Sequence, residues 1–206
     1  MTELLLILFA YLMGSIPTGV VLARVYGVKD ITKEGSGNIG ATNVGRVAGK
    51  KAGIITLAGD ALKGVIPILV VMAVSGSVEW LIAAAALAAF LGHIYPVFND
   101  FKGGKGVATA LGIFLTISPL SALAAMLAFI IPVAIYRYVS LGSIVAAGLI
   151  PAFVGIFSGS SAYIILSAII GGIVIYRHKD NIKRLLNGEE NSLNKGKKEE
   201  AEKPSE

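Results

Sequence analysis

The chain has 206 residues, of which 55% are hydrophobic and only 15% charged, and its mean hydropathy is +0.76. Soluble domains carry about 25% charged residues, so this composition indicates a polytopic membrane protein with one domain. Cysteine is absent and histidine occurs twice, which excludes disulfides, thiol nucleophiles and cysteine-ligated metals and argues against a histidine-rich metal site. The net charge of +5 would suggest nucleic acid in a soluble protein, but here we attribute it to membrane topology and expect no nucleic-acid partner.

The apolar runs predict an all-α protein with seven transmembrane helices. A span needs about 20 mostly apolar residues. No basic segment precedes the first run, so we expect this run to be retained as a span and not cleaved as a signal peptide. The predicted spans are at about 4–25, 53–74, 79–97, 105–118, 120–136, 140–157 and 161–177. Only Ser118 and Pro119 separate the fourth span from the fifth, which predicts either a tight turn or a kink within one bent helix.

The basic residues predict the orientation of these spans. With seven spans, the C-terminal segment shares one side of the membrane with three loops, 26–52, 98–104 and 137–139. All 18 Lys and Arg residues lie in or near that side, which the positive-inside rule assigns to the cytoplasm. The N-terminus is then outside and the C-terminus inside. We expect residues 1–190 to form the membrane domain and residues 191–206, rich in Lys, Glu, Ser and Asn, to form a disordered cytoplasmic tail.

Glycine and small polar residues dominate the first cytoplasmic loop, which contains Gly35-Ser-Gly-Asn-Ile-Gly-Ala-Thr-Asn-Val-Gly-Arg46. Glycine lets backbone N–H groups approach a ligand closely, and a guanidinium can form two hydrogen bonds with a phosphate. The loop therefore predicts a phosphate cradle. A flexible connection between two helices is the alternative interpretation.

Two further cytoplasmic segments carry basic residues beside a predicted span. Residues 92–109 include Lys102-Gly-Gly-Lys105-Gly at the start of the fourth span, where a helix N-terminus favours anions. This segment does not fit the P-loop pattern, so a nucleotide is not implied. Residues 176–189 follow the seventh span and predict either phosphate contacts or an amphipathic helix on the bilayer surface. His178 lies where that span ends, and an imidazole in an ordinary environment titrates near neutrality, so we expect His178 to be able to exchange a proton there.

Together these three segments resemble, in order, the cytosolic motifs of the bacterial acyl-phosphate glycerol-3-phosphate acyltransferases. The resemblance covers nearly the whole chain and includes Gly59-Asp-Ala-Leu-Lys-Gly64 in the second span. It implies transfer of a fatty acyl group from acyl phosphate to the 1-hydroxyl of sn-glycerol 3-phosphate, giving lysophosphatidic acid and phosphate, the first step of phospholipid synthesis. Soluble-type glycerolipid acyltransferases instead use a His, four residues, Asp motif, which neither His93 nor His178 begins.

The resemblance also implies partners and a location. The partners are acyl phosphate, sn-glycerol 3-phosphate and membrane lipids, with no cofactor and no metal. The expected location is the bacterial inner membrane, with the active site on the cytoplasmic face. The oligomeric state stays open, a monomer being plausible.

Roles follow for individual residues from the same resemblance. The implied catalytic set is Ser36, Arg46, Lys105 and His178. Ser36, His178 and Ser143 are expected to hold the phosphoryl group of acyl phosphate, and Arg46, Lys105 and Asn181 to bind glycerol 3-phosphate. The full set of additional substrate-binding residues is Gly37, Asn38, Asn43, Lys102, Gly103, Gly104, Thr109, Ser143 and Asn181.

Several polar residues also have a purely structural interpretation. A lone serine in a helix, such as Ser143, commonly bonds its own backbone, and Asn38 and Asn43 suit turns. Asp60 and Lys63, three residues apart near the start of a span, most simply pair with each other.

His93, at the end of the third span, is expected to be structural. For the mechanism we favour direct attack without an acyl-enzyme, with the proton passing to the departing phosphate or to His178. The alternative function is a membrane transporter of phosphorylated metabolites. Transporters usually show inverted repeats, and no such repeat is visible in this sequence.

Overall fold

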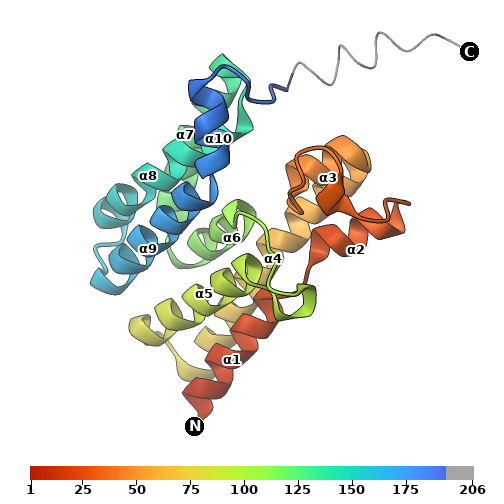
Figure 1. The fold of residues 1–206 in the computed structure, drawn as a ribbon. Coiled ribbons are helices and arrows are strands. Elements are labelled where there is room, and N and C mark those ends of the chain that lie inside the picture. Colours follow the sequence, from red (N-terminus) through yellow and green to blue (C-terminus); the bar gives the residue numbers. More distant parts are fainter. Residues whose placement is uncertain (194–206) are drawn as a thin grey trace, which may run out of the picture.

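The computed structural model describes residues 1–193, and these residues form helices and loops without any strand. Residues 194–206, most of the segment predicted to be a disordered tail, lie outside the described residues. Two short 3₁₀ turns lie within loops: η1 (Ile31–Lys33) between α2 and α3, and η2 (Val97–Asn99) between α5 and α6. The α-helices are α1 (Thr2–Gly14), α2 (Thr18–Val25), α3 (Ala41–Val47), α4 (Lys50–Ser75), α5 (Glu79–Ile94), α6 (Val107–Ile117), α7 (Pro119–Tyr136), α8 (Val139–Phe157), α9 (Ser161–Arg177) and α10 (Lys179–Leu186) (Figure 1).

Every predicted apolar segment forms a helix, but the helices differ in length. Within residues 1–193, five helical segments are long and apolar enough to cross a membrane: Thr2–Val25, Lys50–Ser75, Glu79–Asn99, Pro119–Tyr136 and Val139–Phe157. The pair of α9 and α10, bent by 56°, would make a sixth. The 11 residues of α6 extend about 16 Å, which is short of a hydrocarbon core about 30 Å thick. Seven crossings and the orientation of the termini stay predictions.

Proline marks two breaks in the helices. Ser118 leaves the helical conformation, with φ −152° and ψ 75°, so α6 and α7 are separate helices joined by a tight turn. Of the two sequence-based alternatives, the turn is therefore confirmed. The first apolar segment is interrupted in the same way, because Pro17 separates α1 from α2.

Helices approach closely where one of them presents a glycine. A Cβ on Gly14 of α1 would lie 2.0 Å from the carbonyl oxygen of Ala89 in α5, and one on Gly112 of α6 would lie 2.1 Å from that of Ala61 in α4. A side chain at either position would push the two backbones apart, so these glycines set the helix separation. Figure 1 shows α7 to α10 gathered on one side of the molecule and α1 to α5 on the other, with α6 between them.

A buried ion pair joins α4 to the break after α1. Lys63 Nζ lies 2.9 Å from Asp60 Oδ1 and donates a hydrogen bond to the carbonyl oxygen of Ile16 at 3.0 Å. Both side chains are about 5% exposed or less. His93 Nδ1 is 3.8 Å from the same carboxylate. The predicted pairing of Asp60 with Lys63 is confirmed, and Lys63 also satisfies a carbonyl at the helix break.

Candidate functional site

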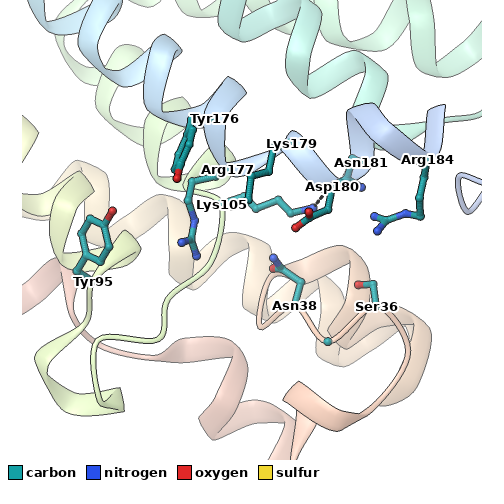
Figure 2. Close-up of a pocket in the computed structure, with 11 residues that line it drawn as sticks. Ser36, Asn38, Tyr95, Lys105, Tyr176, Arg177, Lys179, Asp180, Asn181 and Arg184 are labelled. Atoms are coloured by element: carbon teal, nitrogen blue, oxygen red, sulfur yellow. Dashed lines mark hydrogen bonds between the residues drawn. The ribbon is translucent and has the colours of Figure 1, made fainter. Parts of the chain in front are cut away.

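A pocket of about 350 Å³ forms where the glycine-rich loop after α2, the segment 92–109 and the segment 176–189 meet. The predicted loop 35–46 remains a loop only over residues 35–40, because α3 begins at Ala41. Figure 2 shows this shorter segment, the cradle loop, facing α10, with Lys105 projecting between them and two tyrosines at the other end of the pocket. The lining residues are Ser36, Gly37, Asn38, Tyr95, Lys105, Tyr176, Arg177, Lys179, Asp180, Asn181 and Arg184. They include four cationic side chains and one carboxylate. The pocket is therefore suited to an anion.

Asn43 holds the cradle loop in shape. Its side chain is buried on α3, and its Oδ1 accepts a hydrogen bond from the backbone N–H of Ser36 at 2.8 Å. Its Nδ2 donates to the carbonyl oxygens of Glu34 at 3.0 Å and Asn38 at 2.9 Å. Asn38 in turn accepts from the N–H of Gly40 at 2.8 Å. Both asparagines thus set turns, and Asn43 is a positioning residue outside the pocket lining.

The glycines of the Lys-Gly-Gly-Lys segment pack against the end of α5. A Cβ on Gly103 would lie 2.1 Å from the carbonyl oxygen of His93, and one on Gly104 would lie 2.4 Å from Nε2 of the same histidine. Their own carbonyl oxygens accept hydrogen bonds from Arg177, whose Nε is 3.2 Å from Gly104 O and whose terminal nitrogen is 3.0 Å from Gly103 O. These glycines therefore fix the loop that presents Lys105, and they tie it to the end of α9.

Lys105 reaches across the pocket to α10. Its Nζ donates a hydrogen bond to Oδ1 of Asn181, and Figure 2 marks this contact. The lysine precedes α6 and lies outside the helices. Burial lowers its pKa to about 8, although the carboxylate of Glu190 acts in the opposite direction. Lys105 is therefore mostly cationic at pH 7 and loses its charge at a lower pH than an ordinary lysine.

A carboxylate behind α10 organises two of the lining residues. Glu190 Oε1 accepts hydrogen bonds from Asn181 Nδ2 at 2.7 Å and from Ser140 Oγ at 2.9 Å. Its Oε2 accepts from Arg184 Nε at 2.9 Å. Burial raises the pKa of Glu190, but these hydrogen bonds outweigh that effect and hold the pKa below its ordinary value. The carboxylate is thus ionised at neutral pH.

Several residues that the resemblance implied lie outside the pocket lining. Arg46 is exposed on α3, and Lys102 is exposed at the start of its loop. Thr109 is buried and donates to the backbone carbonyl oxygen of Asp60 at 2.9 Å. Ser143 is buried in α8 and donates to the carbonyl oxygen of Val139 at 3.0 Å, which is the backbone bond expected for a lone serine in a helix.

His178 is buried where α9 meets α10. Its Nδ1 lies 2.7 Å from the carbonyl oxygen of Val174. A carbonyl oxygen only accepts hydrogen bonds, so Nδ1 carries a proton, and in the neutral form of the ring Nε2 is then the acceptor. In its described position the histidine stands behind the pocket, outside its lining.

Sequence reasoning missed part of the site. It assigned no individual role to Tyr95, Tyr176, Arg177, Lys179 or Asp180, and for Arg184 it left phosphate contacts and a surface helix as alternatives. The amphipathic pattern of residues 179–186 did contain the signal, because a helix that follows a basic span end presents its polar face to the loops. Ser140 and Glu190 carried no local signal, since they lie 50 residues apart.

Comparisons with known proteins agree with this geometry. The family model for glycerol-3-phosphate acyltransferase matches residues 4–188. The glycerol-3-phosphate acyltransferase of Syntrophotalea carbinolica is 56% identical over 187 residues, which are 91% of this chain and 95% of that protein. Two crystal structures of PlsY, an integral membrane glycerol 3-phosphate acyltransferase, are each 44% identical to this chain.

The glycerol 3-phosphate form of PlsY has a TM-score of 0.89 and covers 94% of this chain and 96% of its own. The lysophosphatidic acid form has a TM-score of 0.87 and covers 93% and 95%. The resemblance seen in the sequence motifs is thereby confirmed. The chain belongs to the glycerol-3-phosphate acyltransferase family of integral membrane enzymes.

Proposed function

We propose that this protein transfers a fatty acyl group from acyl phosphate to the 1-hydroxyl of sn-glycerol 3-phosphate, at the cytoplasmic face of the bacterial inner membrane. The products are lysophosphatidic acid and inorganic phosphate. The observation that carries this proposal is the pocket itself, where four cations and one carboxylate surround a space of about 350 Å³. Both proposed substrates are phosphate esters or anhydrides, and both suit such a pocket.

The absence of a His, four residues, Asp motif from the sequence supports the choice of an activated donor. His93 and His178 are followed five positions later by Phe98 and Lys183, so neither begins a His, four residues, Asp motif. An acyl phosphate already has phosphate as its leaving group, which makes a covalent intermediate on the protein unnecessary. The family name gives the acceptor and leaves the donor open, so the donor is the part of this proposal that most needs a test.

The proposed reaction is a direct displacement. The 1-hydroxyl oxygen of glycerol 3-phosphate attacks the acyl carbonyl carbon, a C–O ester bond forms, and the bond from the acyl carbon to the phosphate oxygen breaks. The hydroxyl proton leaves with the phosphate, or passes to Nε2 of His178 once that side chain has moved toward the pocket. Lys105 and Arg184 neutralise and orient the two phosphates, so proximity supplies much of the rate.

Residue roles are proposed on this basis. Ser36 lines the pocket, and we propose that its hydroxyl and the loop backbone contact the donor phosphate. Asn181 lines it from α10 beside Lys105, where glycerol 3-phosphate is proposed to bind. Ser143 and His178 stand behind these residues, so for them a role in holding the phosphoryl group requires a change of side-chain position.

Arg46 is proposed to bind glycerol 3-phosphate by swinging toward the pocket from α3. It directly follows the cradle loop and is exposed, so its long side chain is free to change rotamer. We expect Arg46→Ala to lower kcat/KM for glycerol 3-phosphate at least tenfold, with Lys50→Ala, an exposed lysine on the next helix, as the control. Equal kcat/KM values for the two variants would show that Arg46 does not bind glycerol 3-phosphate.

The donor is tested with purified protein in lipid bicelles. Phosphate release and lysophosphatidic acid formation are measured with palmitoyl phosphate, with and without glycerol 3-phosphate, and with palmitoyl-coenzyme A in place of palmitoyl phosphate. We expect equal amounts of phosphate and lysophosphatidic acid, only when palmitoyl phosphate and glycerol 3-phosphate are both present. Comparable lysophosphatidic acid formation from palmitoyl-coenzyme A would overturn the proposed donor.

The membrane orientation is tested with single cysteines, which is simple in a chain that has none. Cysteines at Lys102 and Asn187, both exposed, are expected to react with a membrane-impermeant maleimide only after the inner face is opened. A cysteine at Ser158, exposed in the loop after α8, is expected to react in intact cells. Labelling of Asn187Cys and Ser158Cys from the same side would contradict the proposed topology.

A further inference from the structure

Glu190 lies behind the pocket, just after α10, and is 9% exposed. Its two oxygens accept three side-chain hydrogen bonds, from Ser140 at the start of α8 and from Asn181 and Arg184 on α10. Glu190 does not line the pocket, whereas Asn181 and Arg184 do. The carboxylate therefore connects the pocket wall to α8.

The contact with Glu190 decides which way the amide of Asn181 faces. An ionised carboxylate only accepts hydrogen bonds, so it must face the NH₂ end of the amide. The amide oxygen then faces the opposite way, where it accepts from the ammonium group of Lys105. If the amide flipped, its NH₂ group would meet a group that only donates. One carboxylate thus fixes the position of Lys105 through Asn181.

Arg184 is held by the same carboxylate. Its Nε donates to Glu190 Oε2 at 2.9 Å, and this contact leaves the four N–H bonds of the two terminal nitrogens for a ligand. Figure 2 shows the guanidinium of Arg184 and the amide of Asn181 on the same side of the pocket.

We propose that Glu190 is a positioning residue for glycerol 3-phosphate binding, because it sets the orientation of Asn181 and Arg184 and, through Asn181, the position of Lys105. This inference rests on the proposed function, since it assumes that the pocket between these residues binds the acceptor. Glu190 itself makes no contact with the pocket space and is not a catalytic residue.

The negative charge of Glu190 should influence the pH dependence of activity. Removal of a purely structural residue would not change that pH dependence. Burial lowers the pKa of Lys105 to about 8, and the negative charge of Glu190 limits that fall. Loss of this charge moves the pKa of Lys105 further down, so activity that needs the cation declines at lower pH. The other charged or titratable groups around Lys105 are Arg184, Asp180, Arg177 and His178.

The main test compares Glu190→Gln with Glu189→Gln. The two variants lose the same charge at adjacent positions, but Glu189 is exposed and its side chain makes no hydrogen bond or ion pair among the described residues. A glutamine at 190 presents either its oxygen or its NH₂ group to each neighbour, so it cannot accept from Asn181 and Arg184 with separate oxygens as the carboxylate does. We expect kcat/KM for glycerol 3-phosphate to fall roughly tenfold or more in Glu190→Gln and less than twofold in Glu189→Gln.

The pH profile and a coupled variant complete the test. In Glu190→Gln the alkaline decline of kcat/KM is expected at a lower pH than in the wild type. In a background that carries both Asn181→Ala and Arg184→Ala, Glu190→Gln is expected to cost less than threefold, because both residues through which it acts are already gone. A tenfold loss in that background, or a pH profile that does not move, would overturn the inference.

Two further measurements separate possible failures. If Glu190→Gln does not yield folded protein, Ser140→Ala removes one of the three hydrogen bonds but keeps the charge of Glu190. It is then expected to lower kcat/KM for glycerol 3-phosphate by a smaller factor and to leave the pH profile unchanged, and an unchanged kcat/KM would overturn the inference. If the wild type shows no turnover with palmitoyl phosphate, the proposed donor fails, and the dissociation constant for glycerol 3-phosphate becomes the readout. A tenfold weaker binding in Glu190→Gln but not in Glu189→Gln supports the inference, and equal binding refutes it.

Discussion

Asn43 offers the sharpest test of how the cradle loop is built. Its side chain is 2% exposed and makes three hydrogen bonds of 3.0 Å or less to the backbone of the loop that carries Ser36. The perturbation is Asn43→Asp, which keeps the size of the side chain. It retains the acceptor for the N–H of Ser36 but places an oxygen opposite the carbonyl oxygens of Glu34 and Asn38, where a donor is needed.

The magnitude follows from the bonds lost. A net contribution of about 1 kcal/mol per hydrogen bond gives about 2 kcal/mol for the two bonds that Asp cannot make. At 1.4 kcal/mol per tenfold, that loss lowers the population of the ordered loop by roughly thirtyfold if the loop is only marginally stable by itself, and kcat/KM falls with it. We therefore expect a decrease of at least tenfold for Asn43→Asp and for Asn43→Ala.

The assay is kcat/KM for glycerol 3-phosphate at saturating palmitoyl phosphate, measured well below the melting temperature of each variant. Thr42→Ala serves as the control, because Thr42 is the neighbouring residue on α3 and its side chain is exposed. We expect that variant to stay within twofold of wild type. If Asn43→Asp stays within threefold of wild type as well, these hydrogen bonds do not hold the loop, and the account of the cradle given above is wrong.

The remaining predictions concern charged groups and their partners. Activity is expected to decline above pH 8, because Lys105 has its pKa lowered to about 8 and loses its charge there, while a phosphate ester, with a second pKa of about 6, does not change; a flat profile from pH 7 to 9.5 would contradict this. Arg177→Lys is expected to lose roughly tenfold in kcat/KM, since one ammonium cannot reproduce the fork onto Gly103 and Gly104, and near-normal kinetics would refute it. Lys63→Ala is expected to reduce the melting temperature strongly, because an unpaired buried Asp60 costs about 3–5 kcal/mol, and an unchanged melting temperature would argue against the pairing.

The positions of the helices, and the three segments that contribute to the pocket, could be predicted from the sequence because they depend on local patterns. Apolar runs placed every helix from α4 to α9, and the spacing of Asp60 and Lys63 predicted their ion pair. The breaks were harder, because Pro17 and Ser118 end a helix only where the surrounding packing accepts a turn. The length of α6 was overestimated for a related reason, since Lys105 and Gly106 belong to the loop that packs on α5.

The site could be predicted only in part, because its hydrogen bonds join residues far apart in the chain. Ser36, Asn38, Lys105 and Asn181 were identified as pocket residues through their motifs. By contrast, Ser140 and Glu190 are 50 residues apart in the sequence, and no repeating sequence pattern predicts a contact over that distance. Glu190 also stood at the edge of a segment whose composition predicts disorder.

The backbone and side chains around the pocket explain why three of its four cations can be held ready for a ligand. Arg177 uses Nε and one terminal nitrogen to bind the carbonyls of the Lys-Gly-Gly-Lys segment, and Arg184 uses Nε to bind Glu190. Lys105 uses one of its three N–H bonds on Asn181. Each of these three side chains is therefore held in position by a protein partner and keeps further N–H bonds for a ligand.

Lys179 differs from the other three cations, because it is exposed and lies over the ring of Tyr176, with 5.3 Å between Nζ and the ring centroid. Ordering a flexible cation on binding costs conformational entropy, and that cost has already been met during folding for the three that are tied. We therefore expect the partners of these cations, one carboxylate, one amide and two glycine carbonyls, to contribute to the proposed phosphate binding by holding the cations in position, although neither the carbonyls nor the carboxylate needs to touch the substrate.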